Sequence, residues 1–144
     1  MLGAFFAGPA PTADWSHYGG DQGGTRFSEL TQLNRSNVGE LRIAWQVRTG
    51  AVERRGALLG ASQFQATPIM TPAAAGSSVV VCTPWNRIIA LDPKTGETRW
   101  EFDPKLRATP LYNCRGVSYW EDQLTPAAEP CRHRIFSGTG DLRL

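Results

Sequence analysis

The feature that most constrains the fold of this chain is an internal repeat. When the sequence is shifted by 56 residues, VVVCTPWNRI (79–88) falls on IFSGTGDLRL (135–144) without a gap. Thr83 then meets Thr139, and Arg87 meets Arg143. Self-similarity of this kind is typical of folds built from successive similar units, each burying its apolar face against the next. The sequence therefore predicts parts of two such units.

The segment between 63 and 104 predicts the structure of one unit. Four short apolar runs rich in β-branched residues are separated by turn signals, at 63–70, 77–84, 87–92 and 98–104. Strands at this rhythm, with no helical period, indicate an antiparallel meander. We therefore expect an all-β fold, in which a four-stranded sheet repeated in series is a β-propeller blade. The chain is expected to hold about one full blade and part of the next.

The flanking sequence is less regular. Residues 1–13 form a poorly defined N-terminal segment, and 14–144 are expected to be the N-terminal part of the propeller, cut short at the second repeat. The Gly-rich stretch GGDQGG lacks the Lys-Ser/Thr pair of a phosphate-binding loop, which favours an ordered surface loop. Alternating apolar residues within 37–50 predict a half-buried strand, and 51–62 a basic loop. Because an incomplete ring leaves strand edges open, we expect residues 1–144 alone to fold poorly or aggregate.

Charge and cysteine content exclude several classes of protein. The net charge is +2, with 15 basic and 13 acidic residues interspersed, so we expect no nucleic-acid partner. No apolar run is long enough to span a membrane. Three cysteines without C-x-x-C spacing and only two histidines make a zinc site improbable. Cys114 and Cys131 bracket a short loop and are expected either to form a disulfide or to remain free thiols.

The segment ALDPKTGETRW (90–100) carries a turn motif, A-x-D-x-x-x-G-x-x-x-W, met by Ala90, Asp92, Gly96 and Trp100. Gly96 permits the turn, Asp92 can accept hydrogen bonds from turn amides, and Trp100 is expected to pack between adjacent blades. The motif resembles the tryptophan-docking motif of the quinoprotein dehydrogenases. These are eight-bladed β-propeller enzymes that use pyrroloquinoline quinone (PQQ).

Further stretches resemble the membrane-bound glucose, quinate or shikimate type of that family. They are WSHYGGDQGGTRFSELTQLNRSNVGELRIAW, FQATPIM, VCTPWNRIIALD, WEFDPKL and CRGVSYW, and together they cover nearly all of the chain from Asp14 to Leu144. The resemblance implies that Arg115, Gln65 and Thr139 contact PQQ, whose three carboxylates require cationic and amide donors. The alternatives are a surface Arg after a turn and a buried Gln satisfied by backbone. Leu111 stands where some glucose-type relatives have His, so the substrate stays open among glucose, quinate, shikimate or another polyol.

The resemblance also implies a function. A whole protein of this type would be a periplasmic oxidoreductase that oxidises a sugar, polyol or alcohol by hydride transfer to PQQ and passes electrons to ubiquinone. Its catalytic Asp, its Ca²⁺ or Mg²⁺ ligands and its inner-membrane anchor are expected to lie outside these residues, so this chain alone is expected to be inactive. The alternative is a non-catalytic β-propeller scaffold protein, which would share the turn motif but would not need CRGV or Gln65.

Overall fold

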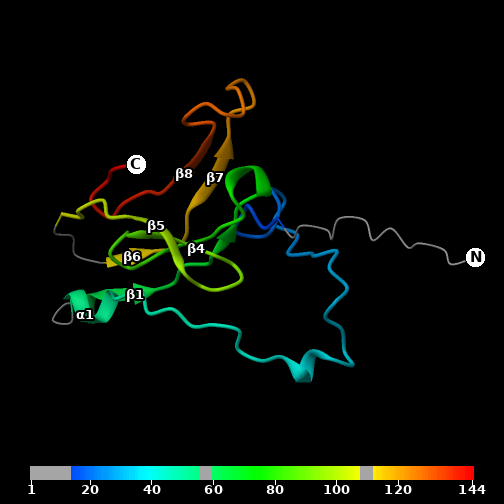
Figure 1. Ribbon diagram of the computed structural model, residues 1–144. Coiled ribbons are helices and arrows are strands. Elements are labelled where there is room, and N and C mark those ends of the chain that lie inside the picture. Colours follow the sequence, from blue (N-terminus) through cyan, green and yellow to red (C-terminus); the bar gives the residue numbers. More distant parts are fainter. Residues whose placement is uncertain (1–13, 56–59, 108–111) are drawn as a thin grey trace, which may run out of the picture.

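The computed structural model of the chain describes residues 14–55, 60–107 and 112–144. Its centre is an antiparallel four-stranded sheet in the order β2-β3-β4-β5, of which β4 and β5 are labelled in Figure 1. The strands are β2 (Ile69–Met70), β3 (Val79–Cys82), β4 (Ile88–Leu91) and β5 (Thr98–Phe102). Sequential pairing of neighbours is the predicted meander, and the all-β prediction is confirmed.

Two smaller sheets flank the meander. β1 (Ser62–Phe64) pairs in parallel with β6 (Tyr112–Cys114), and β7 (Ser118–Glu121) pairs antiparallel with β8 (His133–Phe136). β1 leads into the first strand of the meander, and β6 leads into β7 in the same way. The second set of strands is therefore an incomplete copy of the first, as expected for part of a propeller.

Hydrogen bonds in two turns confirm the 56-residue repeat. Thr83 N donates to Arg87 O at 2.8 Å, and Thr139 N donates to Arg143 O, also at 2.8 Å. The two arginines repeat as well, since each donates to a backbone carbonyl 38 residues earlier in the chain. The same turn geometry at both places shows that the sequence match reflects repeated structure.

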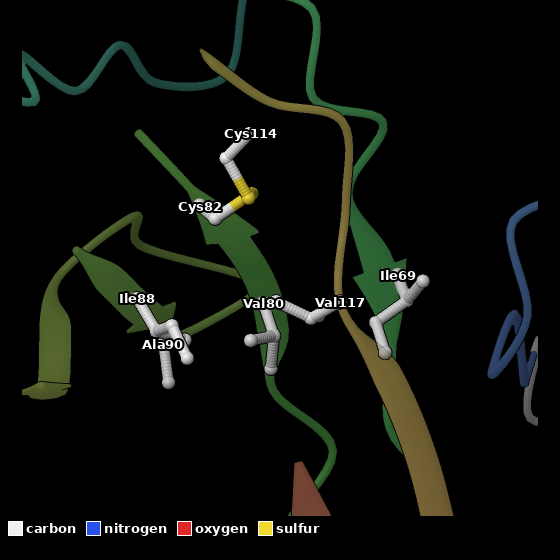
Figure 2. Packing of buried hydrophobic residues seen from close by; sticks show 7 residues of the cluster. All are labelled: Ile69, Val80, Cys82, Ile88, Ala90, Cys114 and Val117. Carbon is white, nitrogen blue, oxygen red and sulfur yellow. A yellow bond between two sulfur atoms is a disulfide. The ribbon is translucent and has the colours of Figure 1, made fainter. Parts of the chain in front are cut away.

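The main core lies between the meander and the start of the second unit. It is formed by seven buried residues from β2, β3, β4, β6 and the segment before β7 (Figure 2): Ile69, Val80, Cys82, Ile88, Ala90, Cys114 and Val117. A second cluster, of Val81, Ile89 and Leu91, occupies the other face of the meander. Both faces of the central strands are thus buried, which explains their nearly continuous apolar sequence.

Three sequence expectations were wrong in detail. The expected strand within 37–50 does not form: the segment 41–47 pairs with no strand among the described residues, and its Ile43 is 77% exposed. Without a partner strand, the backbone N–H and C=O groups of this segment are left to water. Only Trp45 and Val47 from this segment pack, against the second cluster. The expected loop 51–62 contains helix α1 (Ala51–Arg55). The expected first strand 63–70 is divided between β1 and β2, and Pro68, which has no N–H to donate, lies in the break.

Two three-residue 3₁₀ helices lie between the strands and in the segment before them. They are η1 (Val38–Glu40), in the long exposed segment that precedes Trp45, and η3 (Ala73–Ala75), in the turn between β2 and β3. No helix among the described residues is long and apolar enough to cross a membrane.

Candidate functional site

The turn at 92–96 has the geometry that its residues predict. Asp92 Oδ1 accepts hydrogen bonds from Lys94 N at 2.8 Å and Thr95 N at 3.1 Å, and Gly96 takes a φ of +74°. The Arg99 guanidinium donates to the other carboxylate oxygen at 2.6 Å. This hydrogen bond, followed by those from the turn amides, lowers the pKa of Asp92 to about 2. The aspartate is therefore the acceptor that closes the turn.

Sequence reasoning missed the partner of Gly96, which is Trp45. A Cβ at Gly96 would lie 2.7 Å from atoms of the Trp45 ring, so the indole rests directly on the glycine backbone. Trp45 Nε1 also donates to Pro93 O at 3.1 Å. The motif's own Trp100 is 42% exposed and lines a cavity with Ile135 of β8. Its packing between blades stays a prediction.

The expected Cys114–Cys131 disulfide was wrong. Cys114 is bonded to Cys82, and Cys131 is a free, exposed thiol. Both bonded cysteines lie in the main core, 0% and 5% exposed, where the bridge links β3 to β6 (Figure 2). The disulfide forms because Cys82 at the end of β3 lies beside Cys114 at the end of β6. The spacing of the cysteines along the chain does not reveal this proximity.

Gln65 and Arg115 lie side by side in the fold although they are far apart in the sequence. Phe64 of β1 is paired with Cys114 of β6, and each candidate is the next residue along its chain. The parallel contact continues beyond them, where Thr67 N donates to Arg115 O at 3.1 Å. Both side chains are exposed. The alternative of a buried Gln65 satisfied by backbone is therefore excluded, because in the described structure its side chain is exposed and bonds to the side chains of Gln63 and Asn113.

Thr139 occupies a different place. Its hydroxyl donates to Asp141 at 2.6 Å and accepts from Arg143 N at 3.0 Å, so it stabilises the second repeat turn. Hydrogen bonds from Arg143 and then from Thr139 keep the pKa of Asp141 well below its usual range. A cofactor contact through this hydroxyl would have to compete with these bonds. Its assignment to PQQ stays a prediction.

Asn86 connects that turn to β6, and sequence reasoning did not single it out. It is 1% exposed, and it takes a φ of +57° in the first repeat turn. Its Oδ1 accepts from Gly140 N at 3.2 Å, and its Nδ2 donates to Asn113 O at 3.4 Å. The one available signal was an Asn in a turn, since Asn tolerates the left-handed conformation.

These side chains suit an anionic, planar ligand. The Arg115 guanidinium and the Gln65 amide are both exposed, and both carry N–H donors that can bind carboxylate or quinone oxygens. Among residues 14–55, 60–107 and 112–144, no group of three or more His, Cys, Asp or Glu side chains is placed to hold a metal ion. The described site thus supplies donors for a ligand, without a metal-binding cluster of its own.

Comparison with known proteins identifies the family of the chain. Residues 15–144 match the PQQ family model described as the glucose/ethanol/alcohol dehydrogenase β-propeller domain. The chain is 36% identical to quinate/shikimate dehydrogenase (quinone) of Acinetobacter baylyi, over 91% of this chain and 17% of that protein. It is 33% identical to quinoprotein glucose dehydrogenase A of Acinetobacter calcoaceticus, over 92% and 18%.

A third relative is the glycerol dehydrogenase large subunit of Gluconobacter thailandicus, 35% identical over 96% of this chain and 18% of that subunit. The chain therefore spans less than a fifth of the length of each of these three relatives. The family model covers both repeat units and both strands of the β1–β6 pair. This chain therefore belongs to the β-propeller family of PQQ-dependent dehydrogenases.

Proposed function

We propose that this chain forms part of the wall of a PQQ site in a dehydrogenase that oxidises a small polyhydroxylated compound or alcohol. The observation that carries the proposal is the juxtaposition of Gln65 and Arg115 at the ends of two parallel strands. Relatives named for glucose, quinate or shikimate, and glycerol support a sugar or polyol substrate. Leu111, which bears on the choice among them, lies outside the described residues.

In the bound complex, Arg115 and Gln65 would hold the cofactor and orient it. The guanidinium presents a planar fork of donors that matches a carboxylate or a pair of neighbouring oxygens. The Gln65 amide supplies a neutral donor beside it, which a carboxylate side chain could supply only if protonated. PQQ, when bound, supplies the acceptor for the hydride removed from the substrate. The catalytic base and the Ca²⁺ or Mg²⁺ ligands are expected from other parts of the whole protein.

The proposal extends to the compartment and the electron acceptor. A disulfide buried in the core supports an oxidising compartment such as the periplasm, because such bonds persist poorly in the cytosol. The quinone in the name of the quinate/shikimate relative supports ubiquinone as the acceptor. Anchoring in the inner membrane would come from parts of the protein other than these residues.

The test is PQQ binding by the complete product of the gene, measured by equilibrium dialysis in the presence of Ca²⁺ or Mg²⁺. Removal of a charged donor should cost about 1.5–3 kcal/mol, so Arg115→Ala should weaken PQQ binding by roughly ten- to a hundredfold. Arg42→Ala is the matched control, since that exposed arginine donates only to its neighbour's carbonyl in the described structure. Equal PQQ affinity in both variants would remove Arg115 from the site, whereas no PQQ binding by the unaltered protein would favour a non-catalytic propeller.

A further inference from the structure

Three carboxamide side chains form a continuous chain of hydrogen bonds across the β1–β6 pair. Asn113 Nδ2 donates to Gln65 Oε1 at 2.9 Å, and Gln65 Nε2 donates to Gln63 Oε1 at 2.7 Å. Gln63 and Asn113 are also partners in the strand register. Gln65 therefore lies between one donor and one acceptor, with its amide oxygen toward Asn113 and its NH₂ group toward Gln63.

Asn113 is the fixed end of this chain. It lies in β6 between Tyr112 and Cys114, both 5% exposed, and the disulfide anchors the second of these in the core. Its backbone carbonyl accepts a hydrogen bond from the buried Asn86. Gln63 and Gln65, by contrast, are exposed. The anchored residue thus determines the orientation of the exposed ones, because an exposed glutamine has several rotamers, whereas a partly buried strand residue between two buried neighbours has few.

The Asn113 side chain is not explained by stability alone. Its Oδ1 is buried and has no hydrogen-bond partner in the described structure. A buried acceptor left unsatisfied costs free energy, and an apolar side chain of the same shape would avoid that cost. Within the described residues, the side-chain NH₂ group of Asn113 donates to Gln65 alone. The amide is therefore best explained by what it does to Gln65.

The direction of that bond decides what Gln65 can offer a ligand. A carboxamide has one acceptor oxygen and two N–H donors. Since Asn113 donates to the oxygen of Gln65, the Gln65 NH₂ group directs one hydrogen to Gln63, and its second hydrogen has no partner in the described structure and can be donated to a ligand. The reversed amide would present its oxygen to an anionic ligand, and two acceptors facing each other repel.

We infer that Asn113 is a positioning residue, which orients the Gln65 amide so that its N–H group donates to an oxygen of bound PQQ. This inference rests on the proposed function and adds to it a residue that need not touch the cofactor. It also predicts energetic coupling, because the contribution of Asn113 to PQQ binding passes through Gln65.

A double-mutant cycle on the complete gene product tests the inference, with PQQ affinity and the unfolding midpoint without PQQ as the two measurements. Asn113→Leu removes the donor and also the unsatisfied oxygen. It should weaken PQQ binding about five- to tenfold, the effect of one lost hydrogen bond, and leave the midpoint equal or higher. In a Gln65→Ala background the same change should have almost no effect on PQQ binding.

The outcomes separate the inference from the proposed function. Unchanged PQQ affinity in Asn113→Leu, or an equal loss with and without Gln65, overturns the positioning role, even if Arg115→Ala weakens binding as proposed. Unchanged affinity in Arg115→Ala and Gln65→Ala together overturns the proposed site itself, and the inference with it. Asn113→Ala provides the same cycle if the Leu variant does not fold, since it also lacks the donor.

Discussion

The Cys82–Cys114 bridge should be a main source of stability in this part of the molecule. The bond joins residues 32 positions apart, so it restricts the unfolded chain over a loop of that length. Chain-entropy arguments give a stabilisation of about 3.7 kcal/mol at 25 °C for such a loop. Both cysteines are buried in the main core, so their replacement also removes packed sulfur atoms. The expected loss in the free energy of unfolding is therefore roughly 3–5 kcal/mol.

The perturbation is the double variant Cys82→Ala/Cys114→Ala, because serine would add buried hydroxyl groups without partners and confuse the measurement. Equilibrium urea unfolding of the complete gene product measures the loss. Cys131→Ala is the matched control, since that thiol is free and exposed and its replacement should change stability by no more than about 0.5 kcal/mol. Peptide mapping under non-reducing conditions should recover the 82–114 link. A 114–131 link, or a double variant as stable as the parent, would refute the reasoning.

Two further perturbations address the turn at 92–96. Gly96→Ala places a methyl group 2.7 Å from the Trp45 ring in addition to left-handed backbone strain, so it should lower the free energy of unfolding by at least about 2 kcal/mol. Gly76→Ala is the control, because φ is +87° there and an added Cβ would meet no atom within 4 Å apart from its chain neighbours, so this variant should show the backbone strain alone. Equal losses of unfolding free energy in the two variants would contradict the Trp45 contact. For Asp92, whose folded pKa of about 2 is below its ordinary value of 3.8, the stabilising contribution is present above pH 4 and is lost as the pH falls toward 2. Asp92→Asn should flatten the acid limb of stability, measured by unfolding midpoints from pH 2 to 5, and an unchanged limb would exclude this role.

Local pattern predicted the strands of the meander well, because their signals are contained in short stretches. β-Branched runs between turn residues specify β3, β4 and β5 wherever a neighbouring strand follows closely. The 41–47 segment has an equally clear alternation but is unpaired, with Ile43 77% exposed. Alternation reports which face a strand would bury, whereas strand formation also needs a partner edge, which the pattern does not supply.

The candidate site was likewise predicted only in part. Resemblance selected Gln65 and Arg115, and the parallel pairing of β1 with β6 brings their positions together. Neither the Cys82–Cys114 bond nor the Asn113–Gln65 hydrogen bond was foreseen. Each joins residues from separate strands, and no local spacing rule connects them.

The sequence by itself determined the repeat, the turn chemistry of Asp92 and Gly96, and the all-β class, because these depend on backbone preferences and on apolar residues close together in the chain. Only the tertiary structure decided which cysteine pairs with Cys114, what rests on Gly96, and which way the Gln65 amide faces. Those choices follow from the packing of one strand pair against another. Contacts made at long sequence separation depend on the whole fold, and the chain's local pattern does not encode them individually.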